Sequence, residues 1–180
     1  MKIIFSGVQS TGKSSVIKEL KKQKLFTNFV FCDEVIRNLA KQGILINDNA
    51  DDKSQILIME KHLVNLILYD NVICDRNVLD GFVYTRHLFI NNKIDWETYI
   101  YCYKIFEKMI KKSDIIFYIR PEFDLVDDGY RSTNLIYRDE ILELFEDTIY
   151  SLHIPVISLS GTVEERVKKV IYTVEEYIHD

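Results

Sequence analysis

Two glycines, a lysine and a serine near the start of the chain are spaced as in a loop that binds phosphate groups. The loop GVQSTGKS, residues 7–14, lies between the apolar run KIIFS and a helical pattern. Glycines at 7 and 12 let the backbone wrap around phosphate oxygens, and the helix that starts at Lys13 adds the positive end of its dipole. Lys13 would bring a positive charge to the β and γ phosphates, while the Ser14 hydroxyl would coordinate Mg²⁺.

The loop therefore predicts a site for a nucleoside triphosphate, expected to be ATP, together with Mg²⁺. A backbone contact with the purine base is expected where Ser160, Gly161 and Thr162 follow the last apolar run, beside the loop. The residues predicted to bind the nucleotide are Gly7, Val8, Gln9, Ser10, Thr11, Gly12, Lys13, Ser14, Ser15 and Gly161.

Charged residues stand at the ends of three other apolar runs. Asp33 and Glu34 follow FVFC, Asp75 and Arg76 follow NVIC, and Arg120 ends DIIFYIR. In open parallel sheets ligands bind outside the carboxyl ends of the strands. These charged residues are therefore expected at the same edge of a sheet as the phosphate loop.

Asp75 is predicted to hold the metal with Ser14 or to accept the proton of an attacking hydroxyl. A local ion pair with Arg76 or Lys13 is the competing interpretation. Asp33 and Glu34 are also candidates for the catalytic base, because a sequence does not show which carboxylate lies within reach of the hydroxyl.

The phosphoryl acceptor is expected to contact Glu34, Arg37 and Arg76, since these residues lie where a second ligand would enter. Glu34 and Arg37 are also spaced i, i+3, so they could simply stabilise the start of a helix. Both interpretations of this pair stay open at the level of the sequence.

After the fourth apolar run the core pattern stops, and residues from about 121 to 138 are predicted to form a short lid. Arg131 and Arg138 are seven residues apart and would share a helix face if one helix covered both, which would let them reach the transferring phosphoryl group. A hydrogen bond to a charged group contributes about 1.5–3 kcal/mol, more than an exposed salt bridge, so phosphate contact is favoured. The alternative is a pair of solvated arginines bridged to Asp139 or Glu140.

Five apolar runs separated by helical patterns must position these residues. The runs are continuous rather than alternating, which is typical of parallel strands covered by helices on both faces, so a three-layer α/β fold is predicted. One helix is expected after Asp51, with Ile56, Met59, Leu63, Leu66 and Ile67 buried, and two others should begin after Asp95 and Thr162. The runs are residues 2–7, 29–34, 71–76, 114–120 and 155–160.

The composition indicates one globular domain over residues 1–180. Hydrophobic residues make up 47% and charged residues 28%, and the net charge of −5 argues against nucleic acid as a partner. The three cysteines are expected to be reduced, and the four histidines are expected at the surface or in packing roles. No signal peptide or membrane span is expected, which predicts a cytoplasmic protein, and a homodimer is compatible with the sequence.

These residues together resemble the P-loop kinases of small molecules, and within them the AAA-domain group that includes ribosylnicotinamide kinase domains. The resemblance implies the P-loop nucleoside triphosphate hydrolase fold, with a parallel sheet in the order 2-3-1-4-5. It also implies ATP at residues 7–14, an acceptor near Glu34 and Arg37, Asp75 as the acid of strand three, and lid arginines at Arg131 and Arg138. The matching segments are GVQSTGKSS, DEVIRNLAKQG, VICDRNVLDGFVYT, DDGYRSTNLIYRDEILELFE and ISLSGTVEERV.

The expected function is an ATP-dependent kinase that transfers the γ-phosphoryl group to a nucleoside, a nucleoside monophosphate or a related metabolite. The alternative is a nucleotide-binding ATPase or switch without a small-molecule acceptor. A pocket opposite the loop, lined by Glu34, Arg37 and Asp75, would favour the kinase.

Overall fold

Five apolar segments form the strands of one parallel sheet. The computed structural model describes residues 1–32, 35–122 and 134–179. The strand order is β2-β3-β1-β4-β5 and every pairing is parallel, so the predicted sheet and its order are confirmed. The strands are β1 (Lys2–Ser6), β2 (Val30–Cys32), β3 (Val72–Asp75), β4 (Ile115–Ile119) and β5 (Val156–Leu159).

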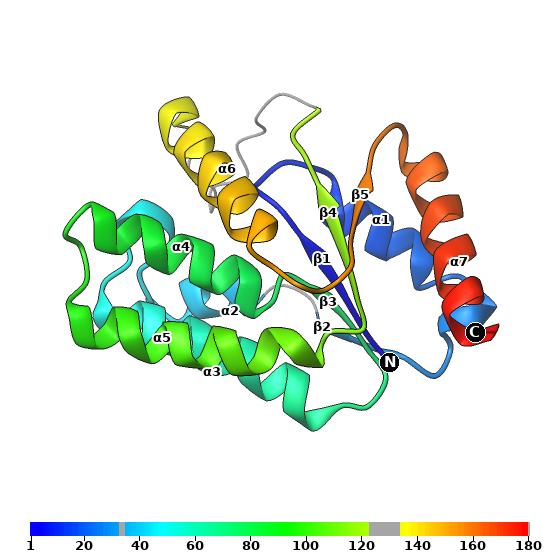
Figure 1. The fold of residues 1–180 in the computed structure, drawn as a ribbon, viewed down its shortest axis with the longest axis horizontal. Helices are drawn as coiled ribbons and strands as arrows, with labels where there is room; N and C mark the ends of the chain where they lie inside the picture. Colours follow the sequence, from blue (N-terminus) through cyan, green and yellow to red (C-terminus); the bar gives the residue numbers. More distant parts are fainter. Residues whose placement is uncertain (33–34, 123–133, 180) are drawn as a thin grey trace.

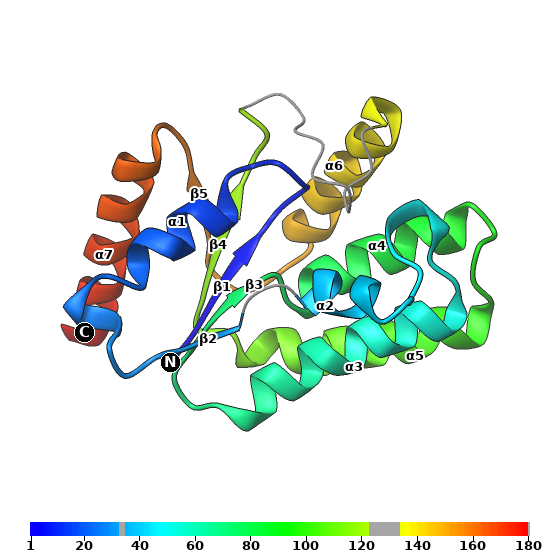
Figure 2. The ribbon, with the colours of Figure 1, turned by 180° about the vertical axis from the view of Figure 1, so that it is seen from behind.

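Helices cover both faces of this sheet (Figures 1 and 2). The α-helices are α1 (Lys13–Leu20), α2 (Val35–Lys41), α3 (Asp52–Leu68), α4 (Val78–Ile90), α5 (Trp96–Met109), α6 (Leu135–Tyr150) and α7 (Val163–His179). The described residues also form three short 3₁₀ turns, η1 (Lys24–Phe26), η2 (Asn47–Asn49) and η3 (Ile110–Lys112).

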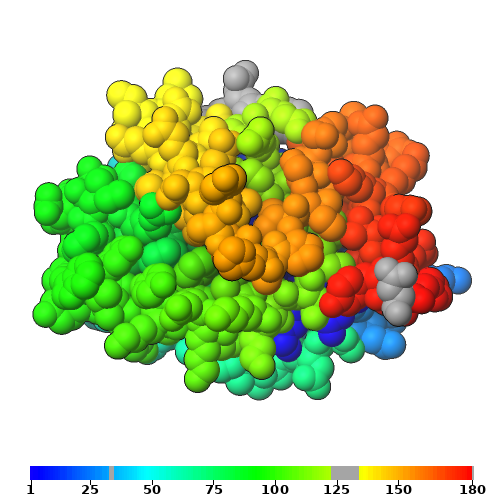
Figure 3. All heavy atoms as spheres, in the orientation of Figure 1, coloured from blue at the N-terminus to red at the C-terminus, as the bar shows by residue number. Residues whose placement is uncertain are grey.

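Successive residues of the central strands enter two different cores. Ile3 and Phe5 of β1 pack with α1 and α7, whereas Ile4 between them packs with α3, α4, α5 and α6. Because side chains alternate along a strand, a strand that is buried on both sides must be continuously apolar. This confirms the three-layer prediction. In Figure 3 the side chains of α4, α5 and α6 leave little of β1 visible from their side of the sheet.

The predicted helix starts are confirmed by their caps. Asp51 accepts a hydrogen bond from the Ser54 backbone N–H at 2.8 Å, and Asp95 accepts one from that of Thr98 at 2.7 Å. Thr162 precedes α7 and accepts from the Glu165 backbone N–H at 3.3 Å. Each cap satisfies a donor that the first helical turn leaves without a partner.

The buried face of α3 differs from the prediction. Ile67 is 65% exposed, while Gln55, Ile58 and His62 are buried beside the expected Met59 and Leu66. The buried face of α3 therefore includes residues 55, 58, 59, 62 and 66. Ile67 lies about 100° around the helix from Leu66 and so points away from this face. Among the helices of the described residues, none combines the length and the apolar character needed to cross a membrane.

Candidate functional site: a phosphate loop and the pocket beside it

The loop between β1 and α1 has a backbone that two glycines make feasible. Gly7 has φ +138° and Gly12 has φ +85°, values that other residues rarely adopt. A Cβ on Gly7 would lie 2.4 Å from the carbonyl oxygen of Ile119 in β4. Gly7 is therefore required by the neighbouring strand as well as by the turn, which the sequence did not indicate.

The Lys13 side chain folds back into this loop and is 5% exposed. Its ammonium group donates to the carbonyl oxygens of Gly7 at 2.8 Å and Val8 at 2.6 Å, and to Thr11 Oγ1 at 3.0 Å. The positive charge is thus held at the centre of the loop, where it would meet the phosphates of a bound nucleotide.

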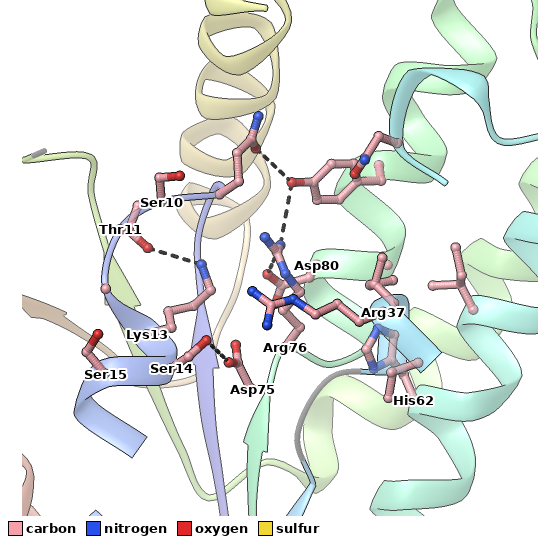
Figure 4. Close-up of a pocket in the computed structure, with 18 of the residues that line it drawn as sticks. Ser10, Thr11, Lys13, Ser14, Ser15, Arg37, His62, Asp75, Arg76 and Asp80 are labelled. Atoms are coloured by element: carbon pink, nitrogen blue, oxygen red, sulfur yellow. Dashed lines mark hydrogen bonds and ion pairs between the residues drawn. The ribbon is translucent and has the colours of Figure 1, made fainter. Parts of the chain in front are cut away.

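Ser14, in the first turn of α1, faces Asp75 at the carboxyl end of β3 (Figure 4). The Ser14 hydroxyl donates to Asp75 Oδ2 at 2.6 Å. Two hard oxygen donors at this position suit Mg²⁺, which prefers carboxylate and hydroxyl oxygens and keeps several of its waters. The described residues contain no cluster of three or more side chains that would hold a metal without further ligands. Mg²⁺ at this site would therefore depend on phosphate oxygens as additional ligands.

Arg76 pairs with Asp80 of α4, a residue to which the sequence analysis gave no role. Arg76 Nη1 lies 3.0 Å from Asp80 Oδ1 and 3.1 Å from the Gly7 carbonyl oxygen. Asp80 also accepts from Ser6 Oγ at 2.7 Å and from the Gly7 N–H at 3.3 Å, so it ties α4 to the phosphate loop. Burial raises the pKa of the Asp80 carboxyl, and the charges of Arg76 and Lys13 oppose that rise.

A sequence signal for Asp80 did exist. Asn77 and Asp80 form a capping box at the start of α4, in which Asn77 accepts from the Leu79 N–H at 2.8 Å and Asp80 accepts from the Asn77 N–H at 3.4 Å. The spacing of a capping box can be seen in a sequence. The second partner, Arg76, stands only four residues before Asp80, but it precedes α4, so the pair depends on the turn between β3 and α4.

Replacing Asp80 by alanine is expected to lower the free energy of unfolding by about 3 kcal/mol or more, because it leaves a largely buried arginine without its carboxylate. Asp147→Ala is the matched control: Asp147 pairs with Arg86 at 2.6 Å but is 67% exposed, so its loss should cost less than about 1 kcal/mol. Urea unfolding of both variants measures the difference. Equal losses would contradict a structural role for Asp80.

A pocket with an empty volume of about 1100 Å³, part of it open to solvent, extends from the loop to α2, α3 and α4 (Figure 4). Its wall brings together the predicted residues 9–15, Arg37, Asp75 and Arg76. It also includes side chains that the sequence analysis did not select, which are Val35, Ile36, Asn47, Gln55, Ile58, His62, Asp80, Gly81 and Tyr84.

Other predicted site residues lie elsewhere. Gly161 does not line the pocket, and its N–H donates to Glu122 Oε2 at 2.9 Å. Arg138, in the first turn of α6, is only 7% exposed and is absent from the pocket wall, so the alternative of a solvated arginine is wrong for it. Arg120 is 61% exposed and pairs with Glu146 of α6 at 3.0 Å.

Three predicted residues lie outside the described part of the chain. They are Asp33, Glu34 and Arg131, and most of the predicted lid lies outside it too. Their assignments remain predictions.

Comparison with known protein families decides the classification. Residues 2–166 match the family described as AAA domain. The chain belongs to this AAA-domain family. The match spans every strand of the sheet and reaches the first turn of α7, so the resemblance inferred from the sequence is confirmed. No curated protein sequence matches the chain.

Solved structures share the fold of this AAA-domain protein at low sequence identity. A deoxyadenosine kinase from M. mycoides with dCMP and dCDP has a TM-score of 0.72 and 17% identity, over 98% of this chain and all of its own. The NadR protein in complex with NR has a TM-score of 0.74 and 21% identity, over 98% of this chain but only 51% of its own. The YorR protein from Bacillus subtilis, with phosphorylated GDP, has a TM-score of 0.63 and 20% identity, over 100% of this chain and 99% of its own.

A buried arginine also supports the phosphate loop of this AAA-domain protein. Arg166 of α7 donates from Nη1 to the Thr11 carbonyl oxygen at 2.6 Å, and its Nη2 lies 3.1 Å from Glu122. The side chain is fully buried although it sits 155 residues from Thr11. Only the fold reveals this contact, because an arginine in a helical pattern is ordinarily predicted to be exposed.

His62 of the AAA-domain protein should make folding sensitive to mild acid. Burial lowers the pKa of this histidine from 6.5 to about 3, and the charge of Arg76 adds to the effect. The unfolded chain takes up a proton below about pH 6.5 while the folded chain stays neutral, so stability is present above that pH and is lost as the pH falls. A change of about 2 kcal/mol is expected between about pH 7.5 and pH 5.

The measurement is the free energy of unfolding at several pH values, for the wild type and for His62→Leu and His62→Gln. Neither variant can bind the proton, so both curves should be flatter than that of the wild type by this amount. Parallel curves would show that the proton uptake does not occur.

Proposed function

We propose that this AAA-domain protein is an ATP-dependent kinase that transfers the γ-phosphoryl group to a nucleoside, a nucleoside monophosphate or a related small metabolite. The pocket carries the proposal, since it continues from the phosphate loop past Asp75 to Arg37 and the inner face of α3. A protein that only hydrolyses or senses a nucleotide does not need a second compartment of this kind beside the γ-phosphate.

The loop residues would hold the nucleotide as predicted. Backbone N–H groups of residues 9–15 and the Lys13 ammonium would receive the phosphates, and Ser14 with Asp75 would bind Mg²⁺. When bound, Mg²⁺ neutralises charge on the phosphate oxygens. The residues of the chain would then contribute by fixing the donor and acceptor in line and excluding water.

Arg37 is proposed to contact the acceptor, and Arg76 is proposed to fix the adjacent part of the pocket wall. Figure 4 shows the Arg37 side chain reaching from α2 toward the side of the pocket that holds Lys13 and Asp75. Arg76 is tied to Asp80 and to Gly7, so it is better suited to position the loop than to move with a substrate. Asp75, Asp33 and Glu34 remain the proposed candidates for the base, and Arg131 and Arg138 the proposed lid contacts of the phosphoryl group.

A screen of nucleosides, nucleoside monophosphates and nicotinamide riboside for acceptor-dependent ADP release tests this proposal. At least one acceptor should raise ADP release well above the rate with ATP and Mg²⁺ alone. If none does, the ATPase or switch function becomes the better account of the site.

A further inference from the structure

One buried side chain of the pocket has polar atoms that nothing in the described structure satisfies. His62 is 1% exposed, lines the pocket, and neither of its ring nitrogens has a hydrogen-bond partner among the described residues. The great majority of buried polar side-chain atoms in proteins are hydrogen-bonded, so each exception needs an explanation. A ligand that enters the pocket would supply the missing partners.

The fold fixes the place of this ring. His62 lies two helical turns after Gln55 and one turn after Ile58 on the inner face of α3, and both of those residues also line the pocket. A Cβ on Gly81 of α4 would lie 2.4 Å from Met59 Sδ and 3.4 Å from His62 Cδ2. The glycine thus lets α3 approach α4 closely, so the imidazole packs against the α4 backbone.

His62 lies on the α3 side of the pocket, away from Lys13 and Ser14, and Arg37 lies between them in Figure 4. The part of an acceptor farthest from its phosphorylated hydroxyl would therefore meet His62. Val35, Ile36 and Ile58 supply apolar wall to the same pocket. Apolar walls with a few placed polar groups are typical of sites for planar organic rings.

The chemistry of the imidazole limits what it can bind. Neutral histidine offers one N–H donor and one nitrogen acceptor. Burial, together with the nearby charge of Arg76, keeps the pKa of His62 near 3, so the ring is neutral at physiological pH. The same surroundings that disfavour a proton on His62 also disfavour a cationic ring beside it.

Building on the proposed kinase function, we propose that His62 is a specificity-determining residue that hydrogen-bonds the uncharged heterocyclic ring of the acceptor. The acceptor is then a nucleoside or nucleotide with a neutral base, whose ring nitrogens, carbonyl and amino groups match a paired donor and acceptor. A nucleoside with a cationic pyridinium ring, such as nicotinamide riboside, does not fit this site.

The first test observes His62 directly, without turnover. Protein with ¹⁵N-labelled histidine, saturated with Mg²⁺ and a non-hydrolysable ATP analogue, is titrated with adenosine, guanosine, cytidine, thymidine, their monophosphates and nicotinamide riboside. The ring ¹⁵N signals of His62, assigned from their loss in His62→Gln, should shift with at least one neutral-base compound. No shift with any compound, or a shift with nicotinamide riboside alone, would overturn the proposal.

The second test uses steady-state kinetics with the acceptor that binds. His62→Leu should raise the KM for the acceptor by at least about tenfold, while the KM for ATP stays the same. His62→Gln should raise the KM for the acceptor by less, because the glutamine amide keeps a donor and an acceptor. His153→Leu, which removes an exposed histidine, is the control and should match the wild type.

The unfolding temperature of His62→Leu distinguishes a role of His62 in binding the acceptor from a role in packing. His62→Leu removes two unsatisfied nitrogens, so it should unfold at the same or a higher temperature at neutral pH. A lower unfolding temperature with an unchanged acceptor KM would make His62 a packing residue only. A His62 shift without turnover would support binding of a neutral ring at His62 but contradict the proposed kinase function. Turnover without a shift would support the kinase function and contradict the role of His62.

Discussion

Replacing Lys13 by alanine is expected to lower acceptor-dependent ADP release by about a hundredfold to a thousandfold, because removing one preorganised group that stabilises charge at the reacting atoms has effects of this order. In the structure this ammonium group is held in the loop by the Gly7 and Val8 carbonyl oxygens and by Thr11. The measurement is the initial rate of ADP formation with saturating acceptor.

Lys18→Ala is the matched control for this prediction. Lys18 belongs to the same helix, in its last turn, and its side chain is exposed. Its loss should leave the rate close to that of the wild type. Far-ultraviolet circular dichroism and unfolding midpoints of both variants check that the fold persists. A folded Lys13→Ala protein with wild-type turnover would refute the role of the loop.

Changing Asp75 to asparagine is expected to weaken the binding of Mg²⁺ by about 10- to 100-fold, so that more Mg²⁺ is required, because this is the usual cost of altering a group that holds or orients a metal ligand. The reason is its place opposite Ser14, with the two oxygens 2.6 Å apart. The measurement is the Mg²⁺ concentration that gives half of the maximal rate, at fixed ATP and acceptor.

Asp70→Asn is the control, since Asp70 is an exposed carboxylate just before the other end of the same strand. It should change neither the Mg²⁺ requirement nor the maximal rate. If Asp75→Asn lowers the maximal rate but leaves the Mg²⁺ requirement unchanged, Asp75 acts on the acceptor proton and the metal assignment is wrong.

The parts of this molecule that could be predicted are those that have a strong local signal in the sequence. The loop around Lys13 has fixed spacing, and strands buried on both faces must be continuously apolar, so the sheet and the position of Asp75 could both be derived. The helix starts after Asp51 and Asp95 were predicted for the same reason, because the residues that mark a helix start act within three or four residues along the chain.

Residues that act across the fold were not predictable in this way. Arg76 adopts φ +74°, an unusual value for a residue other than glycine, and its guanidinium meets Asp80 instead of Asp75. Arg166 reaches the loop from the last helix. Arg76 and Asp80 are only four residues apart, but their contact forms through the turn between β3 and α4 and so belongs to no helical repeat. The Arg166 contact depends on how separate elements pack.

The face of α3 illustrates a third kind of limit. Apolar residues occur on more than one side of this helix, and the pattern selected Ile67 where the structure buries His62. Hydrophobic periodicity locates a helix well but sets its rotation poorly when polar residues line an internal pocket. The side chains that contact a ligand are therefore the ones that such a pattern misplaces most easily.

The most direct test of the proposed kinase is to follow the γ-phosphoryl group itself. ATP labelled in that group is incubated with Mg²⁺, the protein and the acceptor that the screen identifies, and the products are separated and analysed by mass spectrometry. One labelled phosphoryl group should appear on the acceptor for each ADP formed, and none should appear with Lys13→Ala. ADP accompanied only by free labelled phosphate would contradict the transfer and identify the protein as an ATPase.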